Sequence, residues 1–319
     1  MSLTRFLEKK DVKDAFKREF KKPRLKLQGK LLAPPLTNHY GLVGTAFDYL
    51  LRWYIKRLNP DAIEHRWVSE ASFLLLKKTA QFHDLTLQIL KEFPIRLDFV
   101  VIEGTPIKLT LSDSAHLKKV AEIIQYAKKT YKEFIKEGKV SADLCKAVLL
   151  LAQVDIIYRA GLVDENLGNV DENDIKDLYN LISIVKPEYF KAKKICVLNP
   201  AFGEASRLVG GADCDLVIDD AIIEIKTTKN LELKRKHFDQ LIGYYVLYKI
   251  GGIDGMPSNY KIKRLGVYFS RYAYLHFIDV KDIIREDTFP NFVKWFKERA
   301  SENYKLFKEK NHENFRKML

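Results

Sequence analysis

Cysteine is scarce in this sequence of 319 residues, and the three cysteines, Cys145, Cys196 and Cys214, lie far apart. None of them belongs to a CxxC pair, so the sequence encodes neither a zinc ribbon nor a four-cysteine iron–sulfur cluster. Because disulfide frameworks belong to oxidising compartments, this use of cysteine favours a cytoplasmic protein.

Long apolar runs are missing as well. No stretch approaches the ~20 consecutive apolar residues that a membrane-spanning helix needs. The N-terminal segment MSLTRFLEKKDVKDAFKREFKK is charged throughout and lacks the apolar centre of a secretory signal. We therefore expect no association with a membrane.

Basic residues are plentiful. Hydrophobic residues make up 47% and charged residues 30% of the chain, a balance typical of a globular protein. The formal net charge is +13, which favours a polyanionic partner, most simply nucleic acid. Lysine-rich surfaces also stabilise proteins of thermophiles, so charge alone leaves both explanations open. Two groups hold many of the cations: Lys9, Lys10, Lys13, Lys17, Arg18, Lys21, Lys22, Arg24, Lys26 and Lys30, and then Lys229, Lys234, Arg235 and Lys236.

Helical periodicity dominates the first half of the chain. Ser141 is a suitable N-cap and Gly161 a suitable end for one of its helices. The segment at 97–110 is ambiguous and predicts either a short extended piece or a loop. The ranges with helical spacing of apolar residues are 41–58, 61–92 (one helix or two), 113–137 and 141–160.

The pattern changes after the polar, turn-rich stretch at 161–174. Short apolar runs then alternate with helical segments, and Asp219-Asp220 is suited to a tight hairpin turn. The predicted helices are 174–186, 231–250 and 281–317, and the predicted strands are 193–200, 206–219, 221–228, 263–270 and 272–280.

This order indicates an α/β protein. A helix, a meander of three strands, a helix and a further strand follow a helical N-terminal half, and C-terminal helices end the chain. The sheet should therefore combine antiparallel pairs with one helical crossover. We expect a helical N-terminal region, 1–165, that packs on a core with C-terminal helices, 166–319.

Acidic residues gather in GADCDLVIDDAIIEIKTT at 211–228. Glu224 and Lys226 are two residues apart on one strand, so their side chains share a face. Asp215 and Glu224 are similarly distant from the 219–220 turn, so a hairpin brings them opposite each other. Two carboxylates that meet in this way require a cation, and Mg²⁺ or Mn²⁺ suits oxygen ligands. Lys226 can orient a water or neutralise a pentacovalent phosphate, which is typical of metal-assisted phosphodiester hydrolysis.

These residues resemble the motif of the PD-(D/E)XK nuclease superfamily. Asp215 and then Glu224-Ile225-Lys226 match its acids and lysine, with Cys214 in place of the usual proline. The resemblance implies a restriction-endonuclease-like core, whose order of elements is the one predicted above. The apolar pair after Asp215 is also similar to the family's strand, which favours Asp215 over Asp213 as the metal ligand.

Further motifs place the chain near the RecB-like branch of that superfamily. Gln240 and Tyr244 are similar to its QxxxY element and share one face of a helix. The resemblance implies that this face approaches the metal and the DNA backbone. Asp48, in Gly44-Thr45-Ala46-Phe47-Asp48, has the spacing of the branch's GxxxH element, with aspartate in place of the metal-binding histidine.

Other readings of these residues stay open. Glu204 is either an additional upstream ligand or a solvated loop residue, and Asp48 is either a ligand or a helix carboxylate. Tyr244 could pack in the core alone. His237 could contact phosphate or be solvated. Cys214 has no base beside it in sequence that would make it a nucleophile.

We therefore expect a nuclease that depends on Mg²⁺ or Mn²⁺ and hydrolyses phosphodiester bonds, with DNA favoured over RNA. Asp215 and Glu224 would bind the metal, with Asp48 as a third ligand. Lys226 would position the water or stabilise the transition state, and Gln240 and Tyr244 would support the site from the helix. The alternative is a nucleic-acid-binding module that keeps the nuclease fold without turnover. Hydrolysis of a smaller phosphate ester is a third hypothesis.

Overall fold

The computed structural model describes residues 2–24, 27–78, 99–102, 105–108 and 114–318. Two compact units make up the chain, and each contains segments from distant parts of the sequence. The first unit comprises Met1–Pro34, Tyr54–His65 and Ile184–Phe307, and the second comprises Pro35–Trp53, Arg66–Ser183 and Lys308–Leu319. The predicted division between residues 165 and 166 falls inside the second unit.

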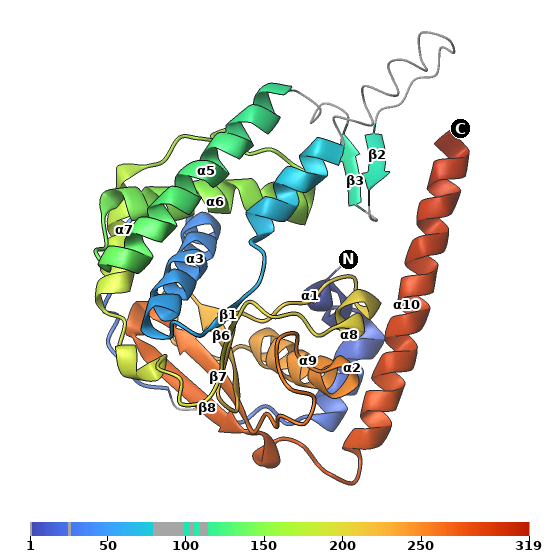
Figure 1. Ribbon diagram of the computed structural model, residues 1–319. Helices are drawn as coiled ribbons and strands as arrows, with labels where there is room; N and C mark the ends of the chain where they lie inside the picture. The colour runs from blue at the N-terminus through green and yellow to red at the C-terminus, as the bar shows by residue number, and fades with distance from the viewer. Residues whose placement is uncertain (1, 25–26, 79–98, 103–104, 109–113, 319) are drawn as a thin grey trace. The chain divides into compact units, whose positions relative to one another are not determined.

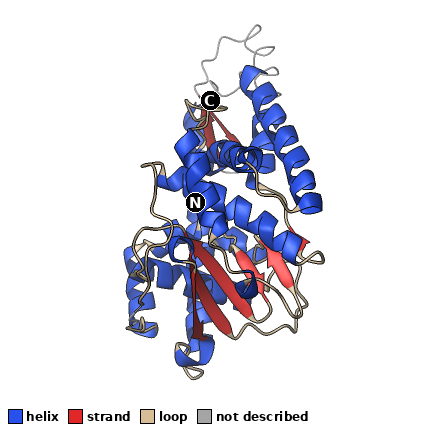
Figure 2. Cartoon of the chain, turned by 90° about the vertical axis from the view of Figure 1, so that its left-hand side faces the viewer, coloured by secondary structure: helices blue, strands red, loops and turns tan. Residues whose placement is uncertain are grey.

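The first unit is built on a mixed sheet of six strands in the order β1-β4-β5-β6-β7-β8 (Figure 2). The meander β4-β5-β6 is antiparallel, β6 and β7 are parallel, and β7 and β8 are antiparallel. The strand β1 adds a parallel edge beside β4. The strands are β1 Ile63–Glu64, β4 Cys196–Leu198, β5 Leu216–Ile218, β6 Ala221–Lys226, β7 Arg264–Phe269 and β8 Tyr274–Asp279.

The turn between β5 and β6 contains Asp219 and Asp220, as predicted. Asp219 adopts a left-handed backbone with φ 49°, which aspartate tolerates better than most residues. Its carboxylate accepts hydrogen bonds from the backbone N–H groups of Lys193 and Lys194, at 3.1 and 2.7 Å. Asp220 pairs with Arg264 at 2.6 Å. These contacts fix the turn to the segments that precede β4 and begin β7, and so stabilise the register of the hairpin.

The crossover helix α9, Arg235–Gly251, connects β6 to β7 and covers one face of the sheet (Figure 1). Around it pack α1 (Leu3–Leu7), α2 (Lys10–Glu19), α8 (Glu204–Leu208) and the first part of α10 (Phe289–Met318). A β-carbon at Gly243 would lie only 3.1 Å from the side chain of Leu3, so this glycine permits the close approach of α1. Val217, Ile222 and Leu265 form the sheet side of this apolar core.

Helices also form the second unit, together with a small hairpin. They are α3 (Tyr40–Leu58, whose last residues belong to the first unit), the helical residues 68–78, α5 (Ser114–Glu137), α6 (Ala142–Ala160) and α7 (Glu172–Ser183). Ser141 caps α6 by accepting from the Leu144 N–H at 3.1 Å, and Gly161 ends it with φ 68°, as predicted. Within the described part of the chain, none of the helices has both the length and the apolarity for crossing a bilayer.

Two predictions of local structure were wrong in part, and one that was left open is decided by the structure. The predicted helix 61–92 begins only at residue 68, because residues 63–64 pair with β4; its portion 79–92 lies outside the described residues. The predicted strand 206–219 starts within helix α8 and becomes a strand only at Leu216. The ambiguous segment 97–110 contains the antiparallel strands β2 (Phe99–Ile102) and β3 (Thr105–Lys108). At residues 63–64, a pairing partner far along the chain outweighs helical periodicity.

A buried carboxylate lies in the second unit. Asp155 on α6 is 1% exposed and accepts a hydrogen bond from the Tyr49 hydroxyl at 2.8 Å. Burial raises the pKa of Asp155 to about 7, although the neighbouring Arg159 and the bond from Tyr49 both favour the ionised form. The unfolded chain therefore loses this proton at lower pH than the folded chain.

We predict that Asp155→Asn makes the second unit less sensitive to alkaline pH. A carboxyl group whose folded pKa is raised stabilises the fold fully below its unfolded pKa, and this stabilisation is lost as pH rises through about 7. Between pH 5 and pH 8 the wild type should lose roughly 2 to 3 kcal/mol more than the variant. Urea unfolding at both pH values, with the exposed Asp143→Asn of the same helix as control, measures this. Equal losses in wild type and Asp155→Asn would contradict it.

Candidate functional site

The β5–β6 hairpin brings two carboxylates to the same end of the sheet. Leu216 pairs with Ile223 in the ladder, and the next step of this register sets Asp215 opposite Glu224. The side chain of Asp215 reaches across the hairpin, where its Oδ2 accepts a hydrogen bond from the Ile225 N–H at 2.6 Å. Both residues therefore lie at the end of the hairpin that is opposite its turn.

Glu224 and Lys226 form a buried ion pair beside Asp215. The Lys226 Nζ donates to Glu224 Oε1 at 2.5 Å, and the Glu224 side chain is only 6% exposed. The second carboxylate oxygen of Glu224, Oε2, is buried and accepts no hydrogen bond. A buried carboxylate oxygen without a donor is costly, which makes this atom a natural ligand for a cation.

Helix α9 contributes Gln240 and Tyr244 to the same face. Gln240 accepts from Lys226 Nζ with its Oε1 at 3.1 Å and donates from Nε2 to the Tyr244 hydroxyl oxygen at 2.7 Å. The two residues are one helical turn apart, which places both side chains over the end of β6. Lys226 is thus held between the strand carboxylate and the helix amide.

The ring of Tyr244 has a structural role as well. It stacks on Phe202, with ring centroids 5.5 Å apart and an interplanar angle of 18°. Core packing and a polar contact to the site, which the sequence left as alternatives, therefore occur together in this residue. Phe202 is a contributor that sequence reasoning missed, because an apolar residue in a loop carries no signal of its later contact.

Charge and burial shift the protonation of several groups here. Burial alone would lower the pKa of Lys226, but the carboxylates of Glu224 and Asp215 outweigh it and raise that pKa above its ordinary value. Burial and the same carboxylates raise the pKa of Tyr244 well above its usual range. Lys226 is therefore a cation and Tyr244 a neutral hydroxyl at neutral pH.

His237 and Cys214 flank this cluster. Burial and then Lys226, Lys236 and Lys234 lower the pKa of His237 to about 4, so its imidazole is neutral at neutral pH. Cys214 is fully buried, and its burial together with the adjacent carboxylates raises its thiol pKa well above the usual value. A protonated, enclosed thiol is a poor nucleophile, which agrees with the absence of a neighbouring base in the sequence.

The remaining candidates lie in other settings. Asp213 forms an isolated bridge with Ala201, before β5 begins. Glu204 opens α8 with its side chain 81% exposed and pairs with Arg207, which favours its interpretation as a solvated residue. Asp48 belongs to the second unit, where it pairs with Arg52 at 2.7 Å. Its role as a third metal ligand stays a prediction.

The two carboxylates suit a hard divalent cation whose remaining ligands are water molecules or substrate oxygens. Among the described residues, no group of three or more His, Cys, Asp and Glu side chains forms a complete metal site. Mg²⁺ binds through one or two carboxylates and keeps waters or substrate phosphate oxygens as its other ligands. Asp215 and Glu224 are the residues that could supply those carboxylates.

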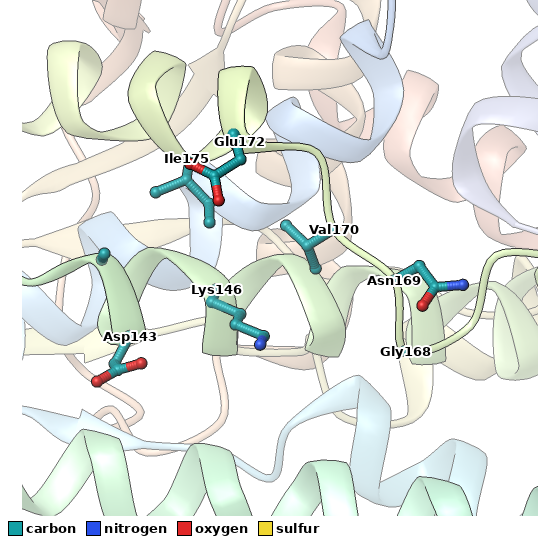
Figure 3. Close-up of a pocket in the computed structure, with 8 residues that line it drawn as sticks. Asp143, Lys146, Gly168, Asn169, Val170, Glu172 and Ile175 are labelled. Atoms are coloured by element: carbon teal, nitrogen blue, oxygen red, sulfur yellow. The ribbon is translucent and has the colours of Figure 1, made fainter.

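A separate hollow in the second unit has different chemistry. It lies between α6, α7 and the loop that precedes α7, with Asp143, Lys146, Asn169 and Glu172 among its lining side chains (Figure 3). Gln153 holds this loop by donating to the Asn169 carbonyl at 2.6 Å. Its single lysine and two carboxylates do not converge on a common point in the close-up, so it is a weaker candidate site.

We predict different effects of removing the hydroxyl and the packing partner of Tyr244. Tyr244→Phe deletes one hydrogen-bond acceptor and should lower the free energy of unfolding by about 1 kcal/mol. Phe202→Ala deletes a buried ring and should cost about 3 to 5 kcal/mol. Urea unfolding of both variants measures the difference. If Tyr244→Phe were as destabilising as Phe202→Ala, the hydroxyl would contribute more to folding than its contacts suggest.

Comparison of the chain with protein-family models, characterised proteins and solved structures finds no match. The case for a function therefore comes from the residues and their geometry.

Proposed function

We propose that this protein is a divalent-metal-dependent nuclease that hydrolyses phosphodiester bonds, with DNA favoured as substrate. The observation that carries this proposal is that two carboxylates and an ammonium lie at the same end of the hairpin: Asp215 accepts from the Ile225 N–H, and Glu224 accepts from Lys226. Two carboxylates and one ammonium at one point suit a reaction in which a cation and a charged phosphate meet.

Asp215 and Glu224 would hold Mg²⁺ or Mn²⁺, with the Ile225 carbonyl as a further candidate ligand. The buried, unbonded Oε2 of Glu224 supports this assignment. When bound, the metal would supply Lewis-acid stabilisation of the phosphoryl group and activation of a water. A thiol or imidazole ligand is not needed for such an ion.

Lys226 would act on the phosphate or on the attacking water through its Nζ. The raised pKa of Lys226 keeps this ammonium charged at neutral pH, so its role is to hold a proton and a positive charge rather than to remove a proton as a free amine. Gln240 fixes the position of Nζ, and Tyr244 in turn fixes Gln240. These two residues act by positioning.

The topology is also compatible with the superfamily that the motif resembles. An antiparallel meander, β4-β5-β6, is followed by a helical crossover and a parallel strand, β7. This is the order of a restriction-endonuclease-like core. Glu224 and Lys226 lie on its third strand, and Asp215 directly precedes the second. The resemblance in motif and the arrangement in space thus support the same proposal.

The alternative is a nucleic-acid-binding module without turnover. The ion pair between Lys226 and Glu224 would then be a structural contact that fills a vestigial site. The presence of both carboxylates, the lysine and its two positioning residues favours an enzyme, because a binding module has no need of buried carboxylates facing a phosphate backbone.

We predict that wild-type protein cleaves DNA in the presence of Mn²⁺, and that Glu224→Gln and Lys226→Ala each lower the rate by about a hundredfold or more. Each variant removes a charge that would face the reacting phosphate. Glu204→Gln and Lys193→Ala make the same chemical changes at exposed positions and should retain activity. Cleavage that persists in both site variants would contradict the site assignment. DNA binding without cleavage by the wild type would favour the nucleic-acid-binding module.

We also predict that Mn²⁺ stabilises the folded wild type. A ligand at a hundredfold excess over its Kd raises the free energy of unfolding by about 2.7 kcal/mol, which thermal unfolding detects as a higher Tm. Asp215→Asn and Glu224→Gln should abolish the shift, whereas Glu204→Gln should keep it. A shift of equal size in all variants would place the metal elsewhere.

A further inference from the structure

An irregular segment of the first unit is hydrogen-bonded to the chain that follows strands β6 and β7, at the end of the sheet where the candidate site lies. Residues 20–24 and 27–33, named here the basic strap, follow α2 and contain no helix or strand. Phe20 accepts a hydrogen bond from Arg235 at 3.0 Å with its carbonyl, and Lys22 donates to the Leu233 carbonyl at 2.6 Å. The start of the strap is thus joined to the beginning of α9.

The other end of the strap is joined to the end of β7. The N–H groups of Leu32 and Ala33 donate to the Arg271 carbonyl at 2.9 and 3.1 Å, and the buried Arg271 guanidinium donates back to the Ala33 carbonyl at 3.0 Å. Gly29 lies between these anchors, close to the side chains of Leu231 and Tyr272. Main-chain and buried contacts therefore hold the strap in place.

These anchoring contacts lie at the same end of the sheet as the candidate site, where strands β6 and β7 end. The strand β6 ends at Lys226, and Thr227 bonds to Ser270 at 3.0 Å, which links the ends of the parallel strands β6 and β7. The Tyr272 hydroxyl then donates to the Lys229 carbonyl at 2.5 Å. The strap, the β6–α9 connection and the end of β7 consequently form one rim around the strand ends that carry Glu224 and Lys226.

The rim is strongly basic. No Asp or Glu occurs in residues 20–33, and Glu232 is the single acid in the connection from residue 227 to residue 236. Lys22 and Arg235 are engaged in the anchoring contacts, so the rim's charge toward solvent comes from other side chains. Among the described residues, the exposed cations are Lys21, Arg24 and Lys30 on the strap, and Lys229, Lys234 and Lys236 on the connection and α9.

We propose that this rim binds the sugar-phosphate backbone of a polynucleotide on either side of the phosphate that is cleaved. This inference rests on the proposed function and extends it, because it assigns the residues that bind the substrate's backbone away from the cleaved phosphate. A single phosphate group needs only the cations at its own site. The six exposed cations described on the strap, the β6–α9 connection and α9 suit a ligand that carries many phosphates in a row.

The position of the strap also suits this role. Because both of its ends are fixed, little conformational freedom is lost when Lys21, Arg24 and Lys30 contact phosphates. Lysine and arginine contacts to phosphate carry no sequence information, so the rim would fix the path of the strand rather than select bases.

The test measures binding separately from cleavage. In the Glu224→Gln background, with EDTA present, fluorescence anisotropy gives the Kd for a labelled DNA oligonucleotide, single-stranded and duplex, over a series of KCl concentrations. The triple variant Lys21→Ala/Arg24→Ala/Lys30→Ala should weaken binding about tenfold or more and reduce the slope of log K against log salt by about 2 to 3.

A matched control comes from the opposite end of the same sheet. Lys191, Lys193 and Lys194 are exposed beside the Asp219 turn, and their replacement by alanine removes the same net charge. This control triple variant should change the Kd and the slope much less. Unchanged binding in the strap variant, or equal losses in both triple variants, would overturn the inference.

A small substrate separates this inference from the proposed function. With Glu224 intact and Mn²⁺ present, the strap variant should hydrolyse bis(p-nitrophenyl) phosphate at the wild-type kcat/KM, because this diester does not reach the rim. An equal loss on the small diester and on DNA would overturn the inference while leaving the nuclease proposal in place. If the wild type cleaves neither substrate, the nuclease proposal fails, and the binding measurements alone decide the role of the rim.

Discussion

The register of one hairpin governs the candidate site. Strand side chains alternate between faces, so a slip of one residue between β5 and β6 would turn Asp215 away from Glu224. The two-residue turn prevents this slip, because Asp219 takes a left-handed backbone and binds the N–H groups of Lys193 and Lys194. The chemistry of the strand ends thus depends on a turn at the far end of the same hairpin.

The second constraint is the burial of the Glu224 charge, and α9 helps to meet it through Gln240. Glu224 lies under the crossover helix, where an isolated carboxylate would be strongly destabilising. Lys226 compensates one of its oxygens, and Gln240 holds Lys226 in turn. The other oxygen has no donor, and this imbalance is what a bound cation would relieve. A chain that used Glu224 only for stability would do better with an apolar side chain.

Features that depend only on nearby residues could be predicted from the sequence. Ser141 and Gly161 bound α6, Asp219 and Asp220 form the turn, and the QxxxY pair shares one face of α9. Features that depend on distant partners were not readable. A helix was predicted at residues 63–64, where β1 forms because β4 offers a free parallel edge about 130 residues later in the chain. Likewise, the stacking of Phe202 on Tyr244 requires a loop and a helix to meet.

The sequence by itself determined which residues could take part in chemistry, because alternation along a strand and spacing along a helix follow from covalent geometry. Spacing grouped Glu224 with Lys226 and Gln240 with Tyr244, and the resemblance to the PD-(D/E)XK superfamily joined both pairs to Asp215 as one expected set. Only the tertiary structure decided their hydrogen-bond partners and which oxygen of Glu224 has no donor. It also decided that two basic segments some 200 residues apart share one rim, because the contacts of Lys22 and Arg235 exist only after the chain has folded.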